Sequence, residues 1–171
     1  MPKNEGYIMA TRVENNFLKQ QGYEEQDQKK IWFNSLQFQP TIVSSLILVG
    51  IVLQSPTLFL IISAVLWINV LIPSANPFEN FYNKYIAPQS DKNRVPPAPG
   101  PRRFAQAMAA VFTLVSGVGL LTGLTTLAYV MQGLLVIAFG ALIFGKFCLG
   151  SYIYHLLQGK TSFANGTCPW S

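Results

Sequence analysis

The feature that most constrains this chain is a pair of long segments without any charged residue. No Asp, Glu, Lys or Arg occurs from Thr41 to Phe78, and none occurs again from Phe104 to Gly145. A helix on the surface of a soluble domain needs a polar outer face, and these segments offer none. Lipid is therefore the expected solvent of both segments, and a single soluble core is the disfavoured alternative.

The composition of the whole chain agrees with a membrane protein. Only 11% of the 171 residues are charged, against about a quarter in soluble domains. A net charge of +5 could suggest nucleic acid, but the basic excess lies in one loop between helices rather than on a folded basic face. We interpret it as a topology signal and expect no nucleic-acid partner.

The apolar runs predict an all-α fold: a polytopic membrane protein with four transmembrane helices in two antiparallel hairpins. A polar cytoplasmic or interfacial N-terminal segment comes first, then a transmembrane hairpin, a basic proline-rich cytoplasmic loop, a second hairpin and a C-terminal tail. Their expected bounds are residues 1–40, 41–76, 77–103, 104–157 and 158–171.

The first hairpin is short. Its runs Thr41–Leu53 and Leu58–Ile72 are below the roughly 20 residues that a span requires. The helices therefore extend into flanking residues, or the hairpin thins the bilayer or rests against a partner. A single span through Pro56 is the alternative, which we disfavour because proline costs a helix a backbone hydrogen bond in lipid.

The segments outside the first hairpin follow from local patterns. In the N-terminal segment, Val13, Phe17 and Leu18 form a short apolar stripe that Gly22 interrupts, and a Glu25–Lys29 pair then leads into the apolar and aromatic residues of 31–38. This pattern predicts an amphipathic helix at the interface, with a partly disordered tail as the alternative. Residues 95–101 are proline-rich and should form an extended connector.

The second hairpin is expected to consist of helices at Phe104–Leu121 and Leu127–Phe147, and the second of these could continue to Leu157. Small residues should let these two helices pack closely, namely Ala105, Ala109, Gly133, Ala141 and Gly145.

The basic residues predict the orientation. All of them lie in the N-terminal segment, the central loop or the C-terminal part, and the hairpin tips carry none. The positive-inside rule then places both termini in the cytoplasm. Aromatic and basic side chains near the ends of the runs are the expected interfacial anchors, namely Trp32, Arg102, Arg103, Tyr152 and Tyr154.

The spans carry little that could support chemistry. Asn69 and Gln132 are polar residues within them, and hydrogen bonding between helices explains both. His155 is the only histidine, so we expect it at the interface and regard it as a weak cofactor ligand that would need help from another chain. No catalytic residue, metal site or cofactor is expected from this chain alone.

The two cysteines are the redox candidates. Cys148 follows Lys146 at the predicted cytoplasmic end of the fourth helix, and Cys168 lies in the tail. A reducing compartment disfavours a disulfide between them. A helix C-terminus also disfavours the thiolate, with Lys146 as the only close cation.

Four short motifs in this order carry a resemblance. They are Asn76-Pro77-Phe78, Tyr85-Ile86-Ala87-Pro88, Pro101-Arg102-Arg103-Phe104-Ala105-Gln106 and Phe147-Cys148-Leu149-Gly150. The chain resembles, over about residues 38–154, the bacterial membrane family catalogued as domain of unknown function 4395. The resemblance implies a four-helix membrane fold in a bacterial inner membrane, either cytoplasmic or intracytoplasmic, and it implies no activity.

This chain departs from the family at one position. Members often have a second cysteine three residues after the first, and here that position is Ser151. The departure removes a dithiol and leaves Cys168 as the one conceivable resolving partner within the chain.

These observations lead to a functional expectation. We expect a non-catalytic accessory or structural subunit that packs against other membrane subunits or against itself in the lipid bilayer. A thiol-linked redox or sulfur-handling protein that uses Cys148, and Cys168 with it, is the alternative. A transporter or a cofactor or pigment holder is a weaker one.

Overall fold

The computed structural model describes residues 12–24, 31, 33–87 and 94–168. Those residues are helical with loops between, and no strand occurs among them, which confirms the all-α class. In chain order the elements are α1 (Arg12–Gln20), α3 (Phe33–Leu53), α4 (Pro56–Leu71), the 3₁₀ turn η1 (Pro73–Ala75), α5 (Pro77–Phe81), the π-helical turn η2 (Tyr82–Ile86), α6 (Gly100–Thr122), α7 (Thr125–Ile143), α8 (Leu149–Leu157) and α9 (Thr161–Gly166).

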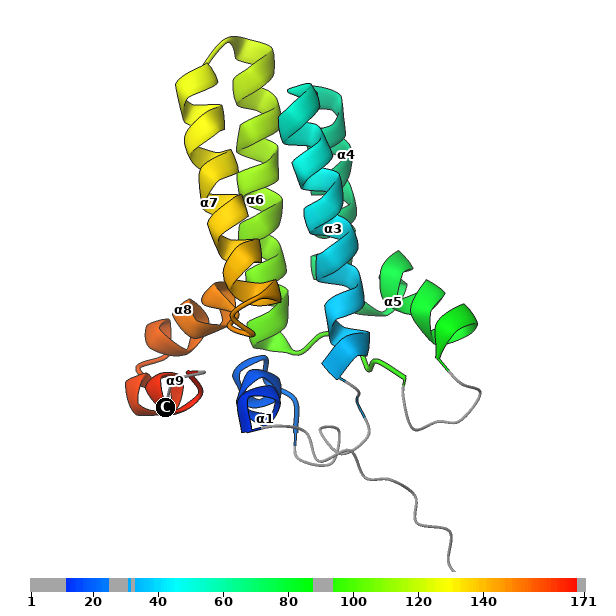
Figure 1. Ribbon diagram of the computed structural model, residues 1–171, viewed down its shortest axis with the longest axis vertical. Helices are drawn as coiled ribbons and strands as arrows, with labels where there is room; N and C mark the ends of the chain where they lie inside the picture. Colours follow the sequence, from blue (N-terminus) through cyan, green and yellow to red (C-terminus); the bar gives the residue numbers. More distant parts are fainter. Residues whose placement is uncertain (1–11, 25–30, 32, 88–93, 169–171) are drawn as a thin grey trace, which may run out of the picture.

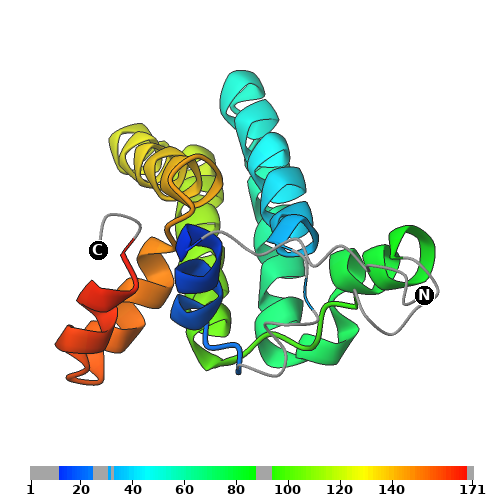
Figure 2. The same cartoon turned by 60° about the horizontal axis from the view of Figure 1, so that its bottom comes forward.

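Four long helices stand side by side, and the short helices gather at one end of them (Figure 1). We call that end, formed by α1, α5, α8 and α9, the base. Figure 2 shows the base from the front, with α1 beside α8. Apolar residues from α1 and its neighbours fill the base, and a second apolar cluster lies higher between α3, α4, α6 and α7.

Among the described residues, three helices are long and apolar enough to cross a membrane, namely α3, α6 and α7. Helix α3 begins at Phe33 and continues through Pro40. The first short run therefore extends into its N-terminal flanking residues, which is one of the alternatives that the sequence left open. Helix α4 is apolar but has only 16 residues, which span about 24 Å at 1.5 Å per residue.

The chain turns sharply between α3 and α4. Gln54 has a positive φ of 44°, and Ser55 caps α4 by accepting a hydrogen bond from the Leu58 N–H (3.4 Å). Pro56 then occupies the first turn of α4, where its missing N–H costs no helix bond. The residues form two helices here, so the single helix through Pro56 is wrong.

Helix α7 ends earlier than the sequence predicts. It stops at Ile143, and α8 begins only at Leu149. Lys146 has a positive φ of 48°, and the Phe147 N–H donates back to the Ala141 carbonyl (3.1 Å). A Cβ on Gly145 would lie 2.7 Å from that carbonyl oxygen. The glycine is therefore required by a reversal of the chain, and its role in packing helix against helix stays a prediction.

Close packing between helices uses glycines of α6 instead. A Cβ at Gly119 would lie 3.2 Å from the Ala128 Cβ on α7, and one at Gly117 would lie 3.0 Å from Leu60 on α4. A Cβ at Gly133 would meet nothing within 4 Å, so its predicted contact within this chain is wrong. Ala105 and Ala109 do pack against the two apolar clusters.

The polar residues within the apolar helices differ in their contacts. Gln132 accepts a hydrogen bond from the side chain of Gln54 (3.3 Å), in agreement with its predicted role. Asn69 is fully buried, yet neither side-chain atom has a hydrogen-bond partner within the described ranges. The predicted hydrogen bond between helices is therefore found for Gln132 and not for Asn69.

Candidate functional site

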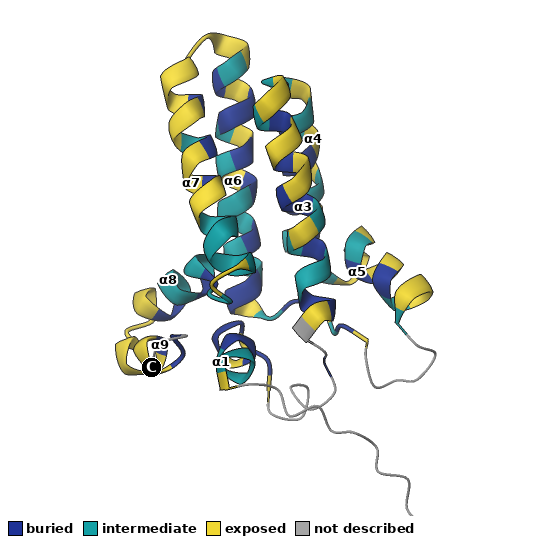
Figure 3. Cartoon of the chain, viewed as in Figure 1, coloured by how far each residue is buried: buried dark blue, intermediate teal, exposed yellow. Residues whose placement is uncertain are grey.

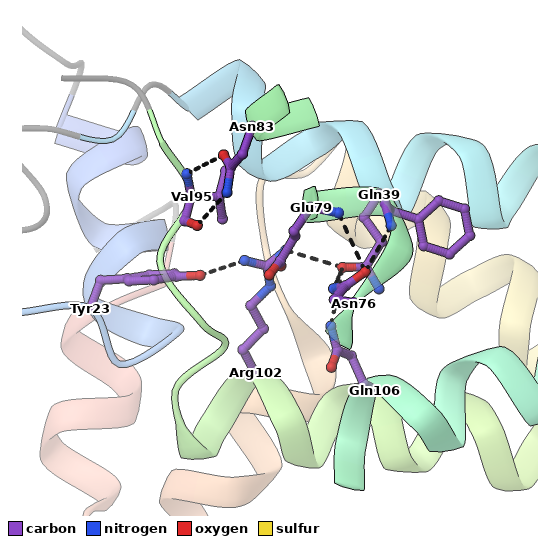
Figure 4. A network of polar contacts seen from close by, with 9 residues as sticks. Tyr23, Gln39, Asn76, Glu79, Asn83, Val95, Arg102 and Gln106 are labelled. Carbon is purple, nitrogen blue, oxygen red and sulfur yellow. Dashed lines mark hydrogen bonds and ion pairs between the residues drawn. The ribbon is translucent and has the colours of Figure 1, made fainter. Parts of the chain in front are cut away.

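A buried polar network lies at the base, where the lower ends of α3 and α6 meet α5 (Figure 4). Its centre is the side-chain oxygen of Gln39 in α3. This oxygen accepts hydrogen bonds from Asn76 Nδ2 (3.0 Å), Gln106 Nε2 (3.2 Å) and Arg102 (3.4 Å). Arg102 and Gln106 are four residues apart on α6 and so project from one face of it.

An ion pair is part of this network. Arg102 lies 2.8 Å from a carboxylate oxygen of Glu79, and the two side chains are 6% and 7% exposed. Arg102 also donates to the Tyr23 hydroxyl. Burial raises the pKa of Glu79, while the Arg102 charge and the Asn76 side chain oppose that rise. A buried pair of this kind depends on both partners, because each charge alone would be costly.

The Asn76-Pro77-Phe78-Glu79 sequence explains how the carboxylate is positioned. Asn76 caps α5, and its side-chain oxygen accepts from the N–H groups of Phe78 (3.1 Å) and Glu79 (3.4 Å). Pro77 occupies the first helical position, where its fixed φ favours a helix start. Cap and proline together fix Glu79 in the first turn, directed at Arg102.

A small cavity lies beside the network. Its volume is about 70 Å³. Polar side chains and one thiol share its wall with apolar side chains of α3, α4, α6 and α7. The lining residues are Gln21, Gln39, Pro40, Val43, Leu66, Arg102, Ala105, Gln106, Ala109, Phe139, Leu142 and Cys148.

Cys148 precedes α8 as its N-cap residue and is 6% exposed. The end of α7 at Ile143 therefore places this thiol at a helix N-terminus, and the expectation of a helix C-terminus is wrong. The Ser151 hydroxyl donates to Cys148 Sγ (3.2 Å). Burial raises the pKa of the Cys148 thiol, and hydrogen bonds from Ser151 and the charge of Arg102 oppose that rise less strongly.

Polar contacts join helix α1 to α8 and to the residues just before it. The Gln20 side chain accepts from the Cys148 N–H (2.8 Å), and the Gln20 carbonyl accepts from His155 Nε2 (2.9 Å). Glu14 and Lys146 form a partly exposed ion pair (3.0 Å). Within the N-terminal segment predicted to be amphipathic, Arg12–Gln20 is helical and packs through Phe17 and Leu18 into the apolar cluster of the base.

The structure places several of the predicted interfacial anchors and candidate residues inside the protein or in contact with its backbone. His155 is buried at 6% exposure, and its Nδ1 has no hydrogen-bond partner among the described residues. Arg102 is a buried network residue and not an exposed anchor. Arg103 donates to the Val70 carbonyl near the end of α4 (2.7 and 3.0 Å). Trp32 lies outside the described residues.

The remaining candidates lie in α8 and α9. Tyr154 packs against Phe104, and the Tyr152 hydroxyl donates to Asn165 (2.9 Å). Cys168 is buried at the end of α9, where its Sγ contacts the Ala164 carbonyl (3.6 Å). Cys148 lines the cavity, whereas Cys168 does not.

Sequence reasoning missed Tyr23, Gln39, Glu79 and Gln106 as site residues. The Asn-Pro-Phe-Glu cap was a usable signal for Glu79, since a carboxylate in a first turn beside an apolar run needs a partner. Three of the motifs that carry the family resemblance supply Asn76, Arg102, Gln106 and Cys148 to this one site.

Comparison with known proteins gives a family match over most of the chain. Residues 33–159 match the family described as Domain of unknown function (DUF4395). No curated protein and no solved structure matches the chain. The match covers the four long helices, the polar network from Gln39 onward, and Cys148.

Proposed function

Because this chain belongs to the family described as Domain of unknown function (DUF4395), we propose its function from its own surfaces. We propose a non-catalytic membrane subunit that packs through α7 against a transmembrane helix of a neighbouring subunit. That neighbour is a different membrane protein or a second copy of this chain, and the same helix surface would serve for both.

The observation that carries this proposal is the outer face of α7. Gly133 and Gly140 are two turns apart on one face, and a Cβ at either would meet nothing within 4 Å. Glycine costs a helix about 1 kcal/mol relative to alanine. Much of α7 is exposed (Figure 3), and its exposed residues include the large apolar side chains of Val130, Val136 and Ile137. Small residues in an apolar face let a second helix approach closely in lipid.

The proposal includes a topology of four spans, α3, α4, α6 and α7, in two hairpins. Both termini and the basic loop face the cytoplasm of a bacterial inner membrane. The gathering of α1, α5, α8 and α9 at the base supports this orientation (Figure 1). The turns at the opposite end, at Gln54–Ser55 and Gly123–Leu124, carry no charge, as expected of the translocated side.

Labelling in intact cells tests the topology. We expect a Thr122→Cys variant to react with a membrane-impermeant maleimide added outside the inner membrane. A Lys160→Cys variant should react only after permeabilisation, because it lies with the base. Both positions are exposed, so the comparison isolates the side of the membrane. Equal labelling of the two variants before permeabilisation would contradict the topology.

A glycine substitution tests the α7 interface. We expect Gly133→Leu to weaken assembly about ten- to hundredfold, because the added side chain prevents close approach of the neighbouring helix. Migration on native gels of gently solubilised membranes measures the effect. Ala64→Leu adds similar bulk at an exposed position of α4 and serves as the control.

The gel result also identifies the neighbour. A purified chain that still forms the larger species alone assembles with itself, whereas one that needs native membranes has a different partner. If the wild-type chain migrates as a lone monomer in every mild detergent, the subunit proposal fails.

A thiol role for Cys148 is a second candidate, and one observation favours it. Cys148 lies at a helix N-terminus and lines the same cavity as Arg102. Both features favour a thiolate or a developing negative charge. Ser151 stands where a neighbouring thiol would be needed, so this role would be that of a single thiol that changes state.

A further inference from the structure

Helix α5 and the turn η2 lie to the side of the long helices, near the end where the base gathers (Figure 1, Figure 2). We call these residues, 77–86, the lateral segment. The Asn83 side chain donates to the Val95 carbonyl (3.0 Å) and accepts from the Val95 N–H (2.8 Å). Tyr82 is buried and packs on Phe38 of α3. These contacts join the lateral segment to α3 and to the chain before α6, so its position is fixed by the fold.

The lateral segment exposes large apolar side chains. Phe81, Tyr85 and Ile86 are 51%, 65% and 47% exposed, and the rings of Phe81 and Tyr85 contact each other with centroids 5.0 Å apart. Leu71 and Ile72, at the C-terminal end of α4, are exposed as well. The exposed apolar surface of α4 therefore continues along the chain into the lateral segment. Aromatic side chains of this kind are enriched where membrane spans meet the lipid headgroups.

The exposed charges of this region are basic. The lateral segment contains one acidic residue, Glu79, and its carboxylate is buried against Arg102 (2.8 Å). Lys84 and Arg94 are exposed, and each is the chain neighbour of one partner in the contact that holds η2 to the chain before α6. The Lys84 ammonium lies 5.2 Å from the centre of the Tyr85 ring. Two cations therefore accompany the exposed aromatic side chains, with the nearby carboxylate already paired.

We propose that the lateral segment binds an anionic phospholipid of the cytoplasmic leaflet. Lys84 and Arg94 contact the phosphate of its headgroup, and Phe81 and Tyr85 lie at the boundary between headgroups and acyl chains. The inference rests on the topology proposed above, because that topology places the base at the cytoplasmic surface. It is independent of the α7 interface.

The position and chemistry of the segment favour a lipid over an acidic protein segment. The lateral segment lies beside the long helices, where lipid surrounds a membrane protein, rather than beneath them. An acidic peptide bound from the aqueous side would pair with Lys84 and Arg94, but it would not bury Phe81, Tyr85 and Ile86. A phospholipid supplies a negative phosphate and an apolar region in one molecule, and both kinds of side chain find their partner in it.

The test uses the full chain in nanodiscs of equal parts phosphatidylglycerol and phosphatidylcholine. The photocrosslinking amino acid p-benzoylphenylalanine replaces Tyr85, and mass spectrometry identifies the lipids joined to it after illumination. We expect phosphatidylglycerol adducts to exceed phosphatidylcholine adducts at least about fivefold, the preference that one cation near an anionic lipid provides. The same photocrosslinker at Val52, which is 83% exposed near the opposite end of α3, should show no preference, because that hairpin tip carries no basic residue.

Matched variants locate the preference in the lateral segment. Lys84→Gln combined with Arg94→Gln removes both proposed phosphate contacts. Lys19→Gln combined with Lys160→Gln removes two exposed cations from other parts of the base. We expect the first pair to bring the adduct ratio at position 85 close to one and the second pair to leave the ratio unchanged. Thermal melting of each variant checks that it is folded.

Several results would overturn the lipid site. They are equal amounts of the two adducts at position 85, a preference that survives in the folded Lys84→Gln, Arg94→Gln chain, and an equal loss of preference in the Lys19→Gln, Lys160→Gln control. In native membranes, a crosslink from position 85 mainly to another protein would show that a protein partner covers the segment instead.

The maleimide experiment at positions 122 and 160 separates this proposal from the proposed topology. If it supports the topology while position 85 shows no lipid preference, the lipid site fails alone. If the topology fails, the base does not face the cytoplasmic leaflet and both proposals fail.

Discussion

Replacing Arg102 with methionine should destabilise the protein by about 3–5 kcal/mol, the usual cost of removing one partner of a buried ion pair. The change leaves Glu79 buried at 5% exposure with no opposing charge, and it removes donors to Tyr23 and Gln39. The free energy of unfolding, measured by chemical denaturation in a mild detergent, gives the effect.

The neighbouring residue provides the control for this prediction. Arg103→Met removes the same charge, but its guanidinium donates only to the Val70 carbonyl in the contacts described above. We expect a loss of about 1.5–3 kcal/mol, as for hydrogen bonds donated by a charged group, and thus a smaller loss than for Arg102→Met. Glu79→Gln combined with Arg102→Met should recover part of the stability, because the neutral amide has no charge to bury. Equal losses for Arg102→Met and Arg103→Met would show that the ion pair is not the source.

Gly150→Ala is expected to have the second large effect, a loss of about 1–3 kcal/mol typical of an overpacked contact. A Cβ at Gly150 would lie 2.6 Å from both Cα and Cβ of Ala105 on α6. Backbone atoms cannot move aside as a flexible side chain can, so α8 must shift away from α6. Thermal unfolding in detergent measures the loss.

A second glycine makes this result interpretable. Alanine is a better helix former than glycine by about 1 kcal/mol, so helix propensity alone predicts that Gly150→Ala should stabilise α8. Gly133→Ala carries the same propensity gain in α7 without a contact in its own chain and should stabilise the monomer or leave it unchanged. A stabilised Gly150→Ala variant would mean that α8 does not pack against α6 as closely as described.

The long helices could be predicted from sequence because their cause is local. Charge-free apolar runs form helices wherever water is excluded, and Ser55 and Pro56 form a turn and a helix start through contacts within four residues. The end of α7 could not be predicted in the same way. Phe144 and Phe147 continue the apolar pattern beyond Ile143. The reversal depends on the conformation of Lys146 and on the absence of a side chain at Gly145.

The polar network could not be assembled from sequence because its partners are far apart. The hydrogen bond between Gln106 and Gln39 joins residues 67 positions apart, and the contact of Arg102 with Tyr23 joins residues 79 apart. A glutamine near the end of a span is typical of an interfacial residue, so nothing local distinguished Gln39. Cys148 was found as a candidate, but its place at a helix start required the end of α7 to be known.

The contacts of α1 with the C-terminal part of the chain affect the order in which the protein can fold during synthesis. The partners of Glu14 and Gln20 are Lys146, Cys148 and His155, which lie 128 to 135 residues later. At translation rates of about 5–20 residues per second, the ribosome reaches them about 6 to 27 seconds after α1 has been synthesised. During that interval the apolar side of α1, with Phe17 and Leu18, has to be shielded from water in another way. The surface of the bilayer binds amphipathic helices through such a side. We therefore expect α1 to lie on the lipid surface while the long helices are inserted and to pack into the base afterwards.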